Sequence, residues 1–178
     1  MTDPLNVLLF VVLTAVAVVA SFHAWRMRLS YGLYRFLAFE SLALLVVWNV
    51  RRWFREPFSP AQVVSWTIIV VSTALAIHGL YLLRVVGQAQ SRLLEDTQTV
   101  VQVGVYRFIR HPLYSSLLLL GWGVFFKGCD LVSAALALVA TVLWFFTARC
   151  EERFNIDRFG AAYGEYIGRT KMFVPFLL

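Results

Sequence analysis

The chain has 178 residues, of which 60% are hydrophobic and 15% are charged, and its formal net charge is +6. Soluble domains are typically about 45–50% apolar, so the composition excludes an ordinary soluble protein and predicts one integral membrane domain. The positive charge would also suit nucleic acid or an anionic surface. Because the arginines flank apolar runs, we interpret them as topology signals and expect no nucleic-acid partner.

Five apolar runs are candidate spans, since a helix needs about 20 apolar residues to cross a bilayer. In chain order they cover 5–25, 34–50, 61–83, 112–126 and 131–148. The first run has no basic residue before it and no cleavage site of small residues, so we expect a retained span and not a signal peptide. Only KGCD separates the last two runs, which predicts a helical hairpin. The expected fold class is therefore all-α, a polytopic membrane protein with about five transmembrane helices.

Two polar segments lie in the second half of the chain. A connector at 84–103 contains SRLLEDTQ, and the tail at 149–178 begins as an amphipathic helix that continues from the fifth run. We expect a single membrane domain, 1–178, with three spans in 1–83 and the connector, the hairpin and the C-terminal helix in 84–178. The two cysteines lie at opposite ends of one apolar run and indicate neither a disulfide nor a metal site.

The loop charges predict an orientation. Five spans place the two termini on opposite sides of the membrane. If the N-terminus is outside, twelve of the 16 lysines and arginines lie inside, and the four outside are Arg51, Arg52, Arg55 and Lys127. This bias follows the positive-inside rule, so we expect the connector and the tail to face the cytoplasm.

Two polar residues interrupt the apolar runs near that face. Glu40 lies five residues after Arg35, and His78 lies six residues before Arg84. At about 1.5 Å per residue both lie roughly 7–9 Å inside the cytoplasmic edge. A carboxylate in hydrocarbon needs a partner or a wet cavity. Two compatible interpretations follow: a structural Glu40–His78 pair, or a substrate pocket that both residues line.

A basic and aromatic cluster, GVYRFIRHPLYSS, precedes the fourth apolar run. Pro112 fits the first turn of a helix, which places Arg110 and His111 at the helix start. The free N–H groups of such a start favour an anion. Tyr106 and Tyr114 add aromatic faces that can hold a cation. The cluster therefore combines features that suit both signs of charge.

Two interpretations of this cluster stay open from the residues alone. Arginine and tyrosine belts are common at span ends, so the cluster fits an interfacial anchor. Its mixed character also fits a site for a zwitterion. At the same predicted face, the fifth run ends in Arg149, Glu151 and Glu152, and paired carboxylates beside a basic helix start are more than an anchor needs.

The stretch DTQTVVQVGVYRFIRHPLY and the later EERFNIDRFGAAYGEYIGRTKMFVP resemble the signature of the isoprenylcysteine carboxyl methyltransferases and their phospholipid-methyltransferase relatives. The shared pattern is G-x-Y, R-H-P-x-Y, a helical hairpin and paired glutamates, and it covers residues 90–178. The resemblance implies an intramembrane methyltransferase that uses S-adenosyl-L-methionine and no metal. Its partners would be membrane lipids and a lipophilic or lipidated substrate, with the cofactor site in 84–178 facing the cytoplasm.

The resemblance also implies roles for single residues. The positions that match the family's cofactor contacts are Gln98, Thr99, Val100, Val101, Tyr106, His111, Pro112, Leu113, Tyr114 and Glu151. The family arginine that orients a substrate carboxylate corresponds to Thr147 here. Either Arg149 takes that catalytic role from a shifted helix face, or the chain does not bind that carboxylate. If the acceptor needs a base, Glu152, Glu40 and His78 are the candidates.

Two alternatives are weighed against this assignment. Intramembrane sterol and enone reductases share a similar R-H-P-x-Y hairpin but use NADPH, whose 2′-phosphate needs several basic residues. The basic residues that would bind this phosphate are Arg107, Arg110, Arg153 and Arg158. The sequence TVV before the G-x-Y favours the methyltransferase. The third hypothesis is a membrane subunit that kept the fold without activity.

Overall fold

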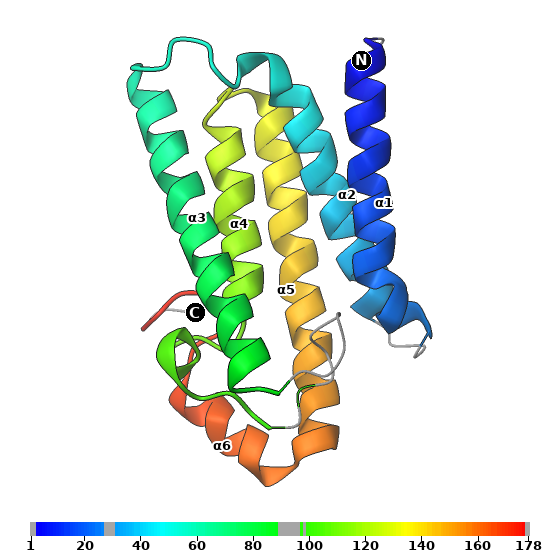
Figure 1. Ribbon diagram of the computed structural model, residues 1–178, viewed down its shortest axis with the longest axis vertical. Helices are drawn as coiled ribbons and strands as arrows, with labels where there is room; N and C mark the ends of the chain where they lie inside the picture. Colours follow the sequence, from blue (N-terminus) through cyan, green and yellow to red (C-terminus); the bar gives the residue numbers. More distant parts are fainter. Residues whose placement is uncertain (1–2, 27–30, 89–96, 98, 177–178) are drawn as a thin grey trace. The chain divides into compact units, whose positions relative to one another are not determined.

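The computed structural model describes residues 3–26, 31–88, 97 and 99–176 (Figure 1). Its α-helices are α1 Pro4–Arg26, α2 Tyr31–Asn49, α3 Pro60–Val85, α4 Pro112–Phe125, α5 Leu131–Phe159 and α6 Ala161–Arg169, with short 3-10 turns η1 Val50–Arg52 and η2 Gly104–Arg107. In these ranges the extended pairing is limited to an isolated bridge between Ile109 and Lys171. The all-α prediction is confirmed.

Four of the described helices, α1, α2, α3 and α5, are long and apolar enough to cross a membrane. The helix α4 is also apolar but has only 14 residues. At 1.5 Å per residue it is about 21 Å long, shorter than a hydrocarbon core of about 30 Å. The chain is therefore an integral membrane protein by the character of its helices, and α4 is the short arm of the predicted hairpin. The predicted orientation stays a prediction.

Local signals fix where several helices begin. The helices α1, α3 and α4 start at Pro4, Pro60 and Pro112, because proline has no N–H to lose in the first turn and its φ already suits a helix. The helix α5 starts after Asp130, whose Oδ1 accepts a hydrogen bond of 2.8 Å from the backbone N–H of Ser133. This is the N-cap interaction that aspartate favours.

The chain divides into two compact units. The first unit contains Met1–Val70 and Leu118–Thr147, and the second contains Val71–Leu117 and Ala148–Leu178. The helices α3, α4 and α5 each contribute residues to both. The single-domain prediction stays a prediction, and each unit is described by itself.

Polar side chains link the apolar helices of the first unit. Thr14 of α1 donates a 3.1 Å hydrogen bond to Oε2 of Glu40 on α2, and α1 packs against α2. The fully buried Asn49 at the end of α2 donates a 2.9 Å hydrogen bond to the Ser133 hydroxyl of α5. Ser65 of α3 donates to the carbonyl of Gly123 on α4 at 2.7 Å. Such interhelical hydrogen bonds stabilise helix packing where water is absent.

Asp130 adds a charged group to these polar contacts of the first unit. Besides capping α5, its carboxylate pairs with the Arg52 guanidinium and accepts a 3.2 Å hydrogen bond from the Trp48 indole. The Ser133 N–H, and then the Arg52 and Trp48 donors, hold the pKa of Asp130 well below its usual range. A carboxyl group with a lowered pKa in the folded state stabilises that state above its unfolded pKa and loses this contribution as the pH falls.

We expect Asp130→Ala to lower the free energy of unfolding by about 1–2 kcal/mol at pH 7, since the cap and the charge pair are both lost. Asp130→Asn keeps a capping oxygen and is expected to be milder. The difference between wild type and Asp130→Asn should be constant above about pH 5 and shrink as the pH falls through about 4, the ordinary range of aspartate. Denaturant titration in mixed micelles measures this, with the exposed Asp157→Asn as control. A difference that grows at low pH would contradict it.

Candidate active site

The G-x-Y motif lies where the connector meets α3, within the second unit. Gly104 has a φ of +57°, and a Cβ on it would lie 2.6 Å from Leu82 Cδ1 and 2.8 Å from His78 Nε2. Only glycine suits both the left-handed backbone and this close approach. Two residues later Tyr106 is buried in a cluster with Leu82 and Val101. The motif therefore fixes the connector against α3.

The tail helix α6 covers the same tyrosine. The Tyr166 hydroxyl donates a 2.7 Å hydrogen bond to the Tyr106 carbonyl, and Tyr163 lies one turn earlier on the same buried face. Burial raises the pKa of all three phenols, so these hydroxyls stay protonated. The sequence analysis predicted an amphipathic helix here but not this hydrogen bond. It also missed the break between α5 and α6 at Gly160, which has a φ of +59°.

Arg110 joins three parts of the second unit. Its side chain is 8% exposed, and Nε donates to Oε1 of Glu152 on α5 at 2.6 Å. Its Nη1 donates to the carbonyls of Thr170 at 2.5 Å and Ile167 at 3.3 Å, at the end of α6. The sequence places Arg110 at a helix start that favours an anion. In the structure its guanidinium instead forms hydrogen bonds with Glu152 and with the carbonyls at the end of α6.

The backbone beside Arg110 pairs with the tail in an extended conformation. Arg110 N–H donates to the Lys171 carbonyl at 2.8 Å, and His111 N–H donates to the Met172 carbonyl at 3.1 Å. The Lys171 N–H returns a bond of 3.0 Å to the Phe108 carbonyl. The tail thus continues past α6 and lies along the start of α4. No local sequence signal predicts this pairing, because it joins segments about 60 residues apart.

The R-H-P-x-Y motif and the paired glutamates meet at this point. Tyr114 on α4 donates its hydroxyl to Oε2 of Glu151. The His111 ring stacks on the Tyr114 ring, with centroids 5.4 Å apart and an interplanar angle of 15°. His111 Nε2 is fully buried, lies 3.5 Å from Oε1 of Glu152, and has no hydrogen-bond partner among the described residues. Four of the residues proposed from the sequence, His111, Tyr114, Glu151 and Glu152, are therefore neighbours.

The remaining predicted site residues lie at different distances from this group. Arg149 is 57% exposed, with Nη1 3.8 Å from Oε2 of Glu152. Its sequence neighbour Thr147 is fully buried and donates to the Leu143 carbonyl at 2.8 Å. The catalytic role of Arg149 in orienting a substrate carboxylate stays a prediction, as does the role of Glu152 as a base.

The connector residues differ in burial. Val101 is buried, Val100 is partly buried and Thr99 is exposed, while Gln98 lies outside the described residues. Pro112 begins α4 as predicted. Leu113 packs on α3, since a Cβ on Gly79 would lie 3.1 Å from its Cδ2.

The predicted substrate-pocket residues belong to different units. Glu40 lies in the first unit, where its Oε2 accepts from Thr14 and its buried Oε1 has no hydrogen-bond partner among the described residues. His78 lies in the second unit beside Gly104. The Glu40–His78 pair and the substrate pocket stay predictions. Within the described ranges, no group of three His, Cys, Asp or Glu residues is placed to hold a metal ion.

The site residues fit a ligand that carries positive charge. Glu151 offers a carboxylate whose partner among the described residues is the neutral hydroxyl of Tyr114, which leaves acceptor sites on both oxygens for an amine. The stacked rings of His111 and Tyr114 lie beside it, and aromatic faces attract cations. The buried Nε2 of His111, which forms no hydrogen bond among the described residues, adds one more polar group. These features suit the amine and sulfonium of S-adenosyl-L-methionine.

The fold and the site define a class: a helical membrane protein whose short hairpin begins in a basic motif that meets paired glutamates. A family profile described as phospholipid methyltransferase matches residues 61–162, more than half of the chain. The chain belongs to this family, as the sequence motifs predicted. The match begins at the start of α3, whereas the motifs recognised in the sequence cover only residues 90–178.

Curated relatives agree with this family. The chain is 37% identical over 86 residues to protein-S-isoprenylcysteine O-methyltransferase B of Arabidopsis thaliana, a match covering 47% of this chain and 43% of that protein. It is 28% identical over 162 residues to methanethiol S-methyltransferase 1 of Bradyrhizobium diazoefficiens, covering 79% of this chain and 53% of that protein. The chain spans about half the length of the curated relatives it matches.

We expect Gly104→Ala to destabilise the protein by about 1–2 kcal/mol from the left-handed backbone alone, and further through the contacts with Leu82 and His78. The matched control is Gly164→Ala on α6, where a Cβ meets nothing within 4 Å. That change should be neutral or stabilising by about 0.5–1 kcal/mol, since alanine favours helix. Thermal unfolding of both variants in detergent measures the contrast. Equal melting temperatures would contradict this account of the motif.

We expect Arg110→Gln to destabilise the second unit by about 3–5 kcal/mol, because it leaves Glu152 buried without its main counter-charge. Arg110→Lys keeps the charge but lacks the planar guanidinium that reaches Glu152 and Thr170 together. The stability of Arg110→Lys should therefore lie between that of the wild type and that of Arg110→Gln. The control is the exposed Arg107→Gln. Hydrogen exchange at the amides of Lys171 and His111 reports the effect. Unchanged protection in Arg110→Gln would show that the ion pair does not hold the tail.

Proposed function

We propose that this chain is an intramembrane methyltransferase that takes its methyl group from S-adenosyl-L-methionine and transfers it to a lipophilic acceptor. The observation that carries the proposal is the contact of Tyr114 with both His111 and Glu151, formed by motifs within the region that matches the family. The relatives are named as methyltransferases of isoprenylcysteine and methanethiol, which supports an apolar acceptor for this chain.

When bound, S-adenosyl-L-methionine supplies an electrophilic methyl group on a sulfonium. Methyl transfer is an in-line displacement, so the chain's main contribution is alignment of the reacting groups. Glu151 would bind the amine by a charge-assisted hydrogen bond. The faces of His111 and Tyr114 would lie against the positive charge. The Arg110–Glu152 pair would act only through the others, by holding their backbone in place.

The acceptor determines whether a base is needed. An acceptor carboxylate is already ionised, and the exposed Arg149 is the group that would orient it. An amine or thiol acceptor must lose a proton. Glu152 is engaged by Arg110, so among the predicted candidates Glu40, with an unpaired Oε1, and His78 are freer to take that proton. Variants at Arg149 therefore separate the two classes of acceptor.

The reductase alternative has less support. Of the four arginines that would bind the 2′-phosphate of NADPH, Arg110 is buried and bound to Glu152 and Thr170. Arg107 and Arg153 are exposed, and Arg158 lies over the ring of Phe159 at 5.0 Å. The family and the names of the relatives favour methyl transfer.

We expect S-adenosylhomocysteine, the demethylated product, to bind the detergent-solubilised protein in calorimetric titration. Glu151→Gln should weaken binding by at least about ten-fold, the effect of losing one charge-assisted hydrogen bond of about 1.5–3 kcal/mol. His111→Ala should weaken binding less, because it removes only a ring face beside the cationic amine. The control is Glu165→Gln, because the side chain of Glu165 is exposed on α6 and pairs with Arg169. NADPH is titrated in parallel. Binding of NADPH and not of S-adenosylhomocysteine would overturn the proposal.

A further inference from the structure

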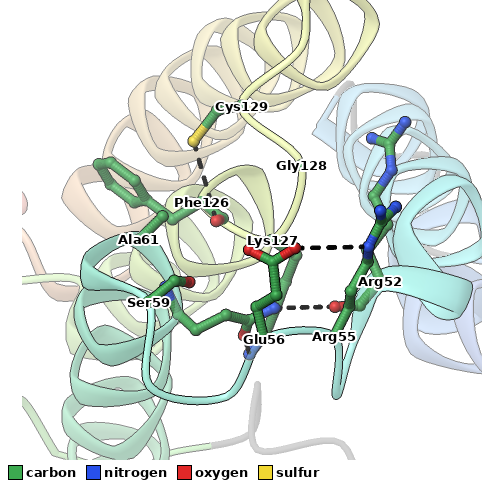
Figure 2. A pocket seen from close by; sticks show the side chains of 10 residues that line it. Arg52, Arg55, Glu56, Ser59, Ala61, Phe126, Lys127, Gly128 and Cys129 are labelled. Atoms are coloured by element: carbon green, nitrogen blue, oxygen red, sulfur yellow. Dashed lines mark hydrogen bonds and ion pairs between the residues drawn. The ribbon is translucent and has the colours of Figure 1, made fainter.

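A polar pocket of about 320 Å³ lies in the first unit and is lined by none of the motif residues discussed above (Figure 2). It is formed by the connection between α2 and α3, residues 50–59, and by the connection between α4 and α5, residues 126–130. The lining residues are Arg52, Arg55, Glu56, Ser59, Ala61, Gln62, Phe126, Lys127, Gly128 and Cys129. Both connections join apolar helices, so the pocket lies at the ends of these helices.

Lys127 is the buried cation of this pocket. The residue is 6% exposed, and its Nζ donates a 2.8 Å hydrogen bond to Oε1 of Gln62. The same Nζ lies 3.7 Å from the ring centroid of Trp66 and 5.5 Å from that of Trp53. Among the described residues no carboxylate pairs with it. Loss of water around the ammonium lowers the pKa of Lys127, as burial of an uncompensated charge does.

The charges around the pocket do not cancel. Arg52 pairs with Asp130, and Arg55 lies 3.8 Å from Glu56. Lys127 therefore leaves one positive charge in excess. The Lys127 ammonium has three N–H donors. One donates to Gln62, and the ammonium also lies over the rings of Trp53 and Trp66. A further acceptor would satisfy both the remaining donor capacity and the excess charge.

We propose that this pocket binds the phosphate group of a singly charged phosphodiester lipid, with Lys127 and Arg55 contacting its oxygens. The volume is at the lower end of ligand pockets, about 300–1,000 Å³, and suits a headgroup and not a whole lipid. Phe54 and Phe58, in the same connection, are exposed by 76% and 91%, as suits residues beside acyl chains. The site does not depend on the proposed methyl transfer.

The test uses the full chain in detergent and three probes at equal ionic strength: diheptanoyl phosphatidylglycerol, diheptanoyl phosphatidylcholine and inorganic phosphate. Native mass spectrometry and thermal unfolding report binding. We expect saturable binding of phosphatidylglycerol, with phosphatidylcholine at least about ten-fold weaker because its ammonium cancels the lipid charge. Equal binding of the two lipids would overturn the proposal. Binding of inorganic phosphate alone would keep the phosphate site and overturn the lipid as its source.

Three variants locate the site. Lys127→Met and Arg55→Gln should each weaken phosphatidylglycerol binding by about ten-fold. Arg55 is 73% exposed, so Arg55→Gln keeps the test decisive if Lys127→Met does not fold. The control is Arg51→Gln, which removes the same charge from the same connection but lies outside the pocket and pairs with Asp3. Equal losses in Arg51→Gln and Arg55→Gln would overturn the proposal, since they would show general attraction to a basic surface.

Discussion

The buried ion pair between Arg110 and Glu152 is the interaction on which the second unit depends. Two charges removed from water are stable only with good geometry and further hydrogen bonds, and Arg110 obtains these from the carbonyls at the end of α6. The pair thus joins α4, α5 and the tail. His111 follows Arg110 in the sequence, and Glu151 precedes Glu152. The ion pair therefore brings together the two residues proposed to hold the cofactor.

Much of the fold follows from local signals in the sequence. Apolar runs predict the spanning helices, and Pro112 predicts the start of α4, because each depends on the residues at hand. The partner of Arg110 and the pairing of the tail with residues 108–111 depend on contacts about 60 residues apart, which no local pattern encodes. The helix break at Gly160 was missed for another reason: a single glycine inside a helical pattern is often tolerated.

Two polar clusters among the described residues differ in the charged group that has no partner of opposite charge. Glu151 on α5 has a carboxylate whose described partner is the neutral hydroxyl of Tyr114 on α4. Lys127, after the end of α4, has an ammonium without a carboxylate among the described residues. In an apolar chain, an uncompensated charge is costly. The carboxylate of Glu151 therefore suits a cationic ligand group, and the ammonium of Lys127 suits an anionic one.

The remaining buried polar atoms sharpen this distinction. Serine, threonine and asparagine side chains in the helices mostly donate to a carbonyl or to a facing hydroxyl, as Ser72 does to the Ser116 carbonyl at 2.7 Å and Asn49 does to Ser133. Buried groups without any partner are rare in folded proteins and call for an explanation. Within the described part of the second unit, the fully buried side-chain atom that lacks a hydrogen bond is Nε2 of His111. This Nε2 lies 3.5 Å from Oε1 of Glu152 without forming a hydrogen bond to it, so a ligand group beside Glu151 would complete its hydrogen bonding.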